Sequence, residues 1–491
     1  MAESIYFYAF TAGNNIIIMR KIAGRAEEIS LLNDYLISDK AEFVVIYGRR
    51  RVGKTFLIRE FFKNEFDFYM SGAENASKGE QLFNFTAAIN KYSNLPYPPV
   101  KTWQAAFVQL RHFLENLKTE GRIVVFFDEL PWLDNVKSGF LSAFEYFWNT
   151  YASADDKIFL IVCGSATSWI TNKILKNRGG LHNRVTHQIC LKPFTLHETE
   201  EFLQIRNIVL DRYQIAECYM IMGGIPYYLE QLQKSKSIYQ NIDNLFFNNS
   251  GVLRNEFEKL YASLFRNSEK QVEIVEALSS KNKGLSREEI VEITGIADGG
   301  TLSKMLEELE LCDFIHSYYS FGKQKKNKLY QLVDFYSLFY LNFIKNQPVT
   351  DENYWTTIID NPLHRAWSGY AFEQLCLMHP SQIRRKLGIS GVMTYSSSWR
   401  SKDSELGAQI DLVIDRRDRI INLCEMKYAD NEFTITKEYD KVLRNKRSVF
   451  KEETHTRKTV HTTMITTYGV KHNEYWGNIQ SEVILDDLFE F

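Results

Sequence analysis

The sequence contains few cysteines, and no two of them lie close together. Its six cysteines form no Cys-x-x-Cys pair, so a reducing compartment is expected, without a zinc site or a disulfide framework. No stretch approaches the roughly 18 uninterrupted apolar residues of a membrane-spanning helix. The sequence therefore predicts a cytoplasmic protein with no membrane partner. The cysteines are Cys163, Cys190, Cys218, Cys312, Cys376 and Cys424.

A strong net charge is also absent. The formal net charge of −2 excludes a polycationic chain, so any contact with nucleic acid must come from local basic patches. A chain of 491 residues is too long for one hydrophobic core, which predicts about two to four domains. Residues 1–18 have Glu3 where a signal peptide would carry positive charge, and they show no clear small-residue cleavage site. We interpret them as an N-terminal extension without an assigned role.

Three apolar runs are present in the first part of the chain. They cover residues 43–48, 122–129 and 157–165 and alternate with longer amphipathic stretches. Continuous apolar strands are buried on both faces, as in a parallel sheet covered by helices. We therefore expect an α/β domain over residues 19–250, in which residues 195–240 form a helical lid.

A basic, glycine-containing loop lies between the first apolar run and a helix pattern. Residues 48–55 fit G-x-x-x-x-G-K-[ST]. The backbone N–H groups of such a loop wrap phosphate oxygens, and the N-terminus of the following helix adds partial positive charge. Lys54 is expected to reach the β- and γ-phosphates of ATP and Thr55 to ligate Mg²⁺. The loop residues expected to bind the nucleotide are Gly48, Arg51, Val52, Gly53, Lys54 and Thr55.

Two acids end the second apolar run. Asp128 and Glu129 follow the buried residues of "VVFF". Asp128 is expected to hold Mg²⁺ through water, and Glu129 to orient or deprotonate the attacking water. The alternative is a strand that ends in two solvated acids, and the phosphate-binding loop upstream favours the catalytic interpretation.

The order of several short motifs resembles a known family. The motifs are Gly24-Arg25, Asp128-Glu129, "CGS" at 163–165, "GGLHNR" at 179–184, "LKPF" at 191–194 and "GGIPYYL" at 223–229. Together with the loop they resemble the archaeal-type P-loop ATPases, close to the signalling (STAND) branch of the AAA+ class.

The resemblance implies three further roles. Ser165 would be a polar sensor near the γ-phosphate, and Pro226 would help to form the adenine pocket. Arg184 would be an arginine finger that acts in cis or from a neighbouring subunit, so a homo-oligomer or a protein partner is implied. Without the resemblance, Arg184 is equally a surface salt-bridge partner and Pro226 a helix breaker.

Residues 260–338 have the pattern of a winged helix. A helix is followed by a capping box from Ser286 to Glu289, a third helix and two strands around the turn "FGKQKK". DNA contact would use Thr301, Ser303 and Lys304 of the third helix and the lysines of the turn. The alternative is packing against other domains, which the acids of the third helix favour because they would repel phosphate. The lysines of the turn are Lys323, Lys325, Lys326 and Lys328, and the acids are Glu307, Glu308 and Glu310.

The last region, residues 340–491, carries charged residues on two predicted strands. Asp411 lies in the first strand, and Glu425 and Lys427 share a face of the second with buried apolar residues. Because unpartnered buried charges are costly, we expect Asp411 and Glu425 to converge on a second Mg²⁺ or Mn²⁺, with Lys427 beside them. Such a metal activates water and stabilises the charge of an attacked phosphodiester.

Asp-x13-Glu-x-Lys across a hairpin resembles the PD-(D/E)XK nuclease superfamily. Glu373, on the predicted helix 363–378, would be the further metal ligand that such nucleases often have, although Gln409 replaces the glutamate of many relatives. The fold expected is an α/β restriction-endonuclease-like domain. The predicted function is Mg²⁺-dependent ATP hydrolysis that regulates a DNA-directed, nuclease-like effector. The alternative is a signalling or scaffolding ATPase whose last domain only binds DNA or a protein.

Overall fold

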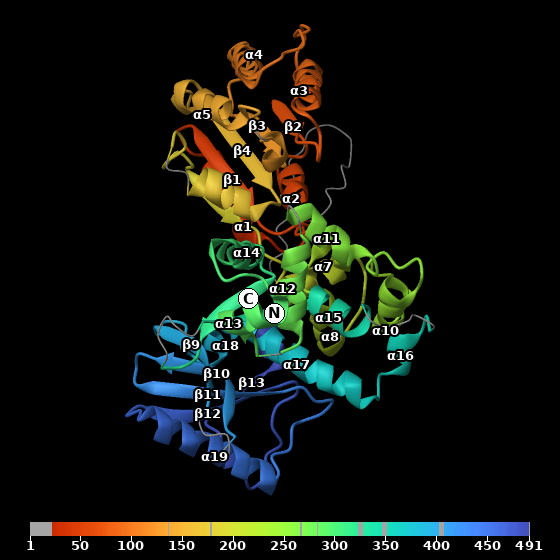
Figure 1. Ribbon diagram of the computed structural model, residues 1–491, viewed down its shortest axis with the longest axis vertical. Helices are drawn as coiled ribbons and strands as arrows, with labels where there is room; N and C mark the ends of the chain where they lie inside the picture. Colours follow the sequence, from red (N-terminus) through yellow and green to blue (C-terminus); the bar gives the residue numbers. More distant parts are fainter. Residues whose placement is uncertain are drawn as a thin grey trace.

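Three β-sheets follow one another along the long axis of the molecule and are connected by helices (Figure 1). The expected extension at residues 1–18 lies outside the residues that the computed structural model describes, as do Lys323, Lys325 and Lys326 of the expected wing. No helix in the described part of the chain has the length and apolar character needed to cross a membrane. The described residues are 22–135, 137–176, 179–265, 268–281, 283–322, 328–345, 351–401 and 407–490.

The first sheet is parallel and has the order β2-β3-β4-β1-β5. Val44 and Ile46 of β1 pack into one core, whereas Phe43 and Val45 pack into the core on the opposite face. The expected sheet with two buried faces is therefore confirmed. The strands are β1 (Glu42–Tyr47), β2 (Phe68–Ser71), β3 (Ile123–Asp128), β4 (Ile158–Gly164) and β5 (His187–Cys190), and the main helices are α1 (Ala26–Leu36), α2 (Lys54–Phe61), α3 (Lys78–Tyr92), α4 (Trp103–Glu115), α5 (Phe140–Thr150) and α6 (Thr167–Ile170).

A group of helices follows β5 and packs onto the core beneath α1 and α2. Two glycines allow the chain to pack closely against the segment between β5 and α7, because a Cβ on Gly48 would lie 2.2 Å from the Leu191 carbonyl oxygen and one on Gly224 would lie 1.9 Å from that of Phe194. Gly48 also has a φ of +143°, which favours glycine. The helices are α7 (Leu196–Ile205), α8 (Arg212–Met222), α9 (Pro226–Leu229), α10 (Ile238–Ile242) and α11 (Glu256–Leu264).

A middle module of helices and a small sheet comes next. Its antiparallel sheet has the order β6-β8-β7. The third helix, α14, lies against the first domain (Figure 1), where Lys176 pairs with Glu307 at 3.2 Å and Lys192 pairs with Asp313 at 2.7 Å. This helix therefore packs within the protein on at least one side. The elements are α12 (Glu269–Ser279), β6 (Leu285–Ser286), α13 (Arg287–Thr294), α14 (Gly300–Leu311), β7 (Ile315–Tyr319) and β8 (Lys328–Leu332).

The C-terminal sheet is mixed and has the order β13-β12-β11-β10-β9. Leu412 and Cys424 pack into the main core shared with α17, whereas Val413 and Leu423 pack against α19 on the other face. The elements are α15 (Phe335–Phe343), α16 (Tyr354–Thr357), α17 (Pro362–Met378), α18 (Pro380–Lys386), β9 (Thr394–Arg400), β10 (Gln409–Arg416), β11 (Ile420–Lys427), α19 (Lys437–Thr454), β12 (Thr459–Thr466) and β13 (Ser481–Ile484).

The middle module is attached to the C-terminal sheet through the end of β7. Ser320 forms a parallel bridge with Ser398 of β9, and the Phe321 N–H donates to the Ser398 carbonyl oxygen at 2.7 Å. The Phe321 ring packs against Phe450 of α19, with 5.0 Å between ring centroids. The residues that begin the expected wing are thus used for contact between domains.

Helix α8 also contacts the C-terminal domain, next to a buried acid. Tyr213 donates to Asp430 at 3.0 Å and stacks on Tyr428, with 5.0 Å between ring centroids. One turn further along the helix, Glu217 is 5% exposed and accepts from the Tyr239 hydroxyl. Burial raises the pKa of Glu217 from 4.5 to about 7.

The raised pKa of Glu217 predicts a pH dependence of stability. Between pH 4.5 and about 7 the unfolded chain releases this proton while the folded chain keeps it, so the free energy of unfolding falls as the pH rises through this window. Glu217→Gln should remove this slope and stabilise the protein above the window by on the order of 3 kcal/mol. Urea unfolding across the window measures it, with Glu230→Gln, an exposed acid, as the control. Equal slopes for wild type and Glu217→Gln would contradict the assignment.

Candidate nucleotide site and C-terminal carboxylates

The phosphate-binding loop joins the carboxyl end of β1 to the N-terminus of α2. Gly53 has a φ of +90° and Arg51 a φ of +72°, so the chain turns sharply and α2 begins at Lys54. The Lys54 side chain lies inside this turn, where its Nζ donates to the carbonyl oxygens of Gly48 at 3.0 Å and Arg49 at 2.9 Å. Burial lowers the pKa of Lys54, and the negative charge of Glu129 opposes this effect. The ammonium group is thus held where the loop would receive phosphate.

The side chains expected to hold Mg²⁺ and water lie beside the loop. The Thr55 hydroxyl donates to the Asp128 carboxylate at 2.9 Å, and Glu129 accepts from the backbone N–H and the hydroxyl of Ser165 at 3.1 and 3.0 Å. Mg²⁺ prefers oxygen ligands, so the adjacent Thr55 and Asp128 oxygens fit this ion. The structure therefore brings together four of the predicted residues.

Three arginines fix the position of the loop, one from outside it and two from within it, and this role was not predicted from the sequence for any of them. Arg25 donates to the carbonyl oxygens of Val52 at 3.2 Å and Lys192 at 2.8 Å. Arg49 and Arg51, which are side chains of the loop itself, point away from the phosphate position into the neighbouring helices. The position of Arg25 in the Gly24-Arg25 motif was the one signal that pointed to it.

The contacts of Arg49 and Arg51 connect the loop to distant parts of the chain. Arg49 is 2% exposed and pairs with Asp334, which caps α15, at 2.5 Å. Arg51 pairs with Glu256 of α11 at 2.5 Å and lies 4.0 Å above the Tyr227 ring. These contacts follow from tertiary packing, so no local sequence pattern predicts them.

Pro226 and Arg184 differ in their relation to the loop. Pro226 begins α9, directly before the Tyr227 that Arg51 covers, so it lies close to the loop. Arg184 is exposed and precedes β5, whose start pairs with Val44 in the middle of β1. Because β5 is parallel to β1, Arg184 lies near the amino edge of the sheet, roughly 20 Å from the loop. In this arrangement Arg184 does not lie near its own loop, and the finger role of this residue stays a prediction.

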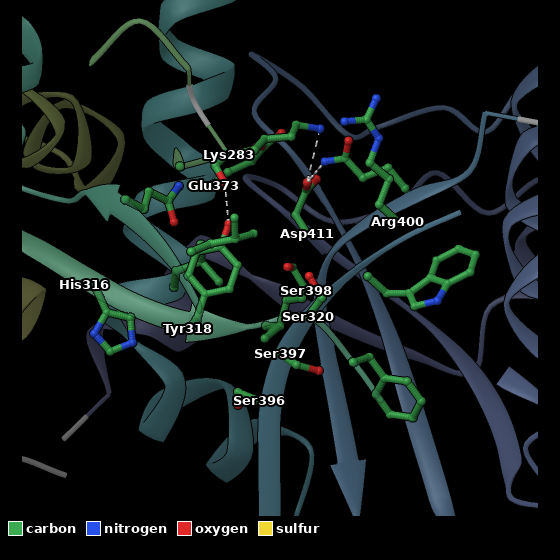
Figure 2. A pocket seen from close by; sticks show the side chains of 18 of the residues that line it. Lys283, His316, Tyr318, Ser320, Glu373, Ser396, Ser397, Ser398, Arg400 and Asp411 are labelled. Carbon is green, nitrogen blue, oxygen red and sulfur yellow. Dashed lines mark hydrogen bonds and ion pairs between the residues drawn. The ribbon is translucent and has the colours of Figure 1, made fainter. Parts of the chain in front are cut away.

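Two of the C-terminal acids line one cavity between the middle module and the C-terminal domain (Figure 2). Asp411 accepts from the Gln409 side-chain amide at 2.8 Å and lies 3.6 Å from the Lys283 ammonium nitrogen. Glu373 extends into the same cavity from α17. Burial and, to a smaller extent, the nearby charge of Asp411 together raise the pKa of Glu373 to about 7.

Glu425 does not line this cavity, and its negative charge is paired with lysine side chains instead. Its carboxylate accepts from the Tyr439 hydroxyl and Lys446 of α19, both at 2.7 Å, and lies 3.2 Å from the Lys427 ammonium nitrogen. Although burial acts to raise the pKa of Glu425, the two lysines lower it. In the described ranges no three His, Cys, Asp or Glu side chains are grouped as metal ligands. The expected convergence of Asp411, Glu425 and Glu373 is therefore not present in this arrangement.

Comparison with known proteins gives a relative over most of the chain and another over a short stretch. An uncharacterized protein of Methanocaldococcus jannaschii is 25% identical over 410 residues, which is 83% of this chain and 87% of that protein. An uncharacterized ATP-binding protein of the same archaeon is 46% identical over 41 residues, or 8% of this chain and 70% of that protein.

Solved structures resemble the protein only in part. The Walker-type ATPase PABY2304 of Pyrococcus abyssi has a TM-score of 0.47 and 19% identity, and the match covers 65% of this chain and 96% of that one. The ORC2 protein of Aeropyrum pernix has a TM-score of 0.42 and 12% identity over 69% of this chain and 94% of that one.

A family described as an ATPase domain predominantly from Archaea matches residues 22–232. This range contains the parallel sheet, the phosphate-binding loop, the acids at the end of β3 and the first lid helices. The chain therefore carries an ATPase domain of the archaeal type, and the protein is an ATPase.

Proposed function

We propose that the ATPase domain acts as a nucleotide-dependent switch that controls a DNA-directed, nuclease-like C-terminal domain. The observation that carries the proposal is the buried ion pair between Arg49 of the phosphate-binding loop and Asp334 at the start of α15. A change in the loop on ATP binding or hydrolysis would act directly on the point where the middle module passes into the C-terminal region.

A second set of contacts supports the same coupling. The first lid helix, α7, receives two contacts from the C-terminal region, since the Leu196 N–H donates to His379 at 3.2 Å and His197 lies 3.1 Å from the Phe489 carbonyl oxygen. Next to it, Arg212 of α8 pairs with Asp486 at 3.3 Å. Movement of the lid would therefore be transmitted to the C-terminal sheet without passing through the middle module.

The nuclease-like interpretation assigns the C-terminal chemistry to Asp411, Glu425, Lys427 and Glu373. Asp411 and Glu373 would supply oxygen ligands to Mg²⁺ or Mn²⁺ from one cavity. Glu425 would join them only after releasing Lys446. The middle module would be a winged helix used for domain packing, because α14 and the end of β7 contact the neighbouring domains.

The alternative function is a signalling or scaffolding ATPase whose last domain binds DNA or a protein without cleaving. It is favoured by the pairing of Glu425 with two lysines. In either case, a second copy of the chain would have to supply Arg184 to the nucleotide, because this residue lies far from its own loop.

The ATPase assignment predicts different effects for two substitutions. Lys54→Ala should lower ATP hydrolysis by about a hundredfold or more and weaken nucleotide binding, because it removes the charge beside the β/γ-phosphates. Glu129→Gln should leave binding intact and slow hydrolysis by about a hundredfold or more. Phosphate release and nucleotide titration measure both. Glu307→Gln, on the α14 surface, is the control, and wild-type hydrolysis by Glu129→Gln would disprove its catalytic role.

The coupling predicts that Asp334 affects both stability and the nucleotide site. Asp334→Asn keeps an oxygen to cap α15 but leaves the Arg49 guanidinium buried without a counter-charge, which costs roughly 3–5 kcal/mol of unfolding free energy. ATP affinity should also fall, because the loop loses its anchor. Asp313→Asn removes an exposed pair and should cost at most about 1 kcal/mol. Urea unfolding and ATP titration measure both, and equal results for the two variants would refute the coupling.

The C-terminal assignment predicts a separation between metal binding and cleavage. Asp411→Ala should remove Mn²⁺ binding at this site and plasmid cleavage, whereas Lys427→Ala should keep Mn²⁺ binding and lose cleavage alone. ATP hydrolysis should survive both, since the phosphate-binding loop lies in another domain. Calorimetric titration and plasmid nicking measure these, with Asp418→Ala on the same hairpin as the control. A wild-type protein that never cleaves, with or without ATP, would favour the alternative function.

A further inference from the structure

The strands β7 and β9 each present an unusually polar row of side chains to the cavity between them. Alternation along β7 puts His316, Tyr318 and Ser320 on one face, and alternation along β9 puts Ser396 and Ser398 on one face, followed by Arg400. All six line the cavity (Figure 2). The bridge between Ser320 and Ser398 joins the two strands at one end.

The small side chains of this surface leave a large space open. The cavity has a volume of about 1080 Å³, which reaches the upper end of the about 300–1,000 Å³ typical of ligand sites. A pair of packed domains would ordinarily fill such a space with apolar side chains, as Phe321 and Phe450 do next to it. The serines therefore leave open a space that larger side chains would fill, and they add hydroxyl groups to a lining that also contains apolar residues such as Leu377 and Trp399.

Several polar groups of the cavity lack a partner within the protein. The Gln374 side chain is 1% exposed, and its Oε1 has no hydrogen-bond partner among the described residues. Within the same described part, the side chains of Glu373 and Arg400 have no hydrogen-bond or ion-pair partner. The Tyr318 hydroxyl donates to the Lys283 carbonyl oxygen at 2.6 Å, but its ring is stacked on no other ring of the described residues. A buried acceptor without a partner is costly, which applies to Gln374, whereas the Glu373 and Arg400 side chains and the Tyr318 ring are accessible to a ligand in the cavity.

We propose that this cavity binds a short single strand of nucleic acid. One base stacks on the Tyr318 ring, and the sugar–phosphate chain follows the serine hydroxyls toward Arg400 and Lys283. Stacking on aromatic rings and phosphate contacts with cations are the two interactions by which single strands are bound. The proposal deepens the proposed function, because Asp411 and Glu373 lie at the same end of the cavity, but binding does not require that cleavage occur.

The shape of the cavity favours a single strand over a duplex. Hydrogen-bonded strands lie only about 4.8 Å apart, so the bridge between Ser320 and Ser398 brings β7 and β9 together within the cavity and narrows the space for a wide ligand there. A duplex is much wider, since its major groove alone measures about 12 Å. The two acids would repel phosphate, so we expect binding to need a divalent cation that offsets their charge.

The test is fluorescence anisotropy with full-length protein and a short labelled single-stranded DNA, in the presence of Ca²⁺. Tyr318→Ala should weaken binding about tenfold or more, because it removes the stacking surface. Tyr318→Phe keeps the ring and should bind like wild type. Ser398→Leu should block binding by filling the cavity, and Arg400→Ala should weaken it. Arg111→Ala removes an exposed charge of α4 outside the cavity and serves as the control. Unchanged ATP hydrolysis identifies the variants that are folded.

The same measurement is made with single-stranded RNA. Binding of either the DNA or the RNA strand supports the proposal, and the strand that binds identifies which sugar the site accepts. A duplex of the same sequence, or a mononucleotide, that binds as tightly as the single strand would overturn it. So would folded Tyr318→Ala and Arg400→Ala proteins with wild-type affinity. A wild-type protein that binds the strand but never cleaves it would count against the nuclease-like function, whereas the proposal of a single-strand binding site would still be supported.

Discussion

The buried ion pair between Arg49 and Asp334 is the interaction on which the arrangement of the domains depends. Removing two charges from water is costly unless they are paired, so Arg49 fixes the position of Asp334 relative to the phosphate-binding loop. Asp334 in turn caps α15 and accepts from Ser337. One contact therefore ties the nucleotide loop to the helix that leads into the C-terminal domain.

The rest of the core extends from this point. The face of the first sheet that carries Val44 and Ile46 shares one continuous hydrophobic core with the lid helices, the middle module and α17, whereas the opposite face packs only within the first domain. The ATPase site thus lies on the side of its domain that faces the other domains. This asymmetry gives a nucleotide-dependent change a direct route to the C-terminal region, where Tyr213 and Arg212 of α8 make further contacts.

The middle module contacts both of its neighbouring domains. Its three helices and small sheet have the element order expected from the sequence, but α14 pairs with the ATPase domain and Phe321 packs against α19. The packing alternative is therefore the one that these contacts favour. The space that remains between β7 and β9 is lined in part by the serines of β9 and by Ser320, which follows β7. Small polar residues at an interface leave room for a ligand and provide hydrogen bonds for it.

Local patterns predicted the parts of the site that depend on neighbours in sequence. The apolar run of β1, followed by Gly48, Gly53 and Lys54, predicted the loop, and the end of β3 predicted Asp128 beside Thr55. The hairpin was also predicted, since β10 and β11 match the expected strands. Glu425 was predicted to meet a metal because a buried charge needs a partner, but the sequence did not identify Lys446 as that partner. Their contact depends on how α19 packs, and many lysines in the chain satisfied the same requirement.

The sequence by itself determined the class of the first domain, its nucleotide loop and its acids, because these depend on strand–turn–helix patterns of short range. The tertiary structure decided which distant side chains meet. It separated Arg184 from its own loop, because β5 is parallel to β1 and places Arg184 at the opposite edge. It also brought Asp334 to Arg49 and Lys283 to Asp411. Contacts between residues far apart in the chain are fixed by the packing of whole elements, and no local pattern encodes them.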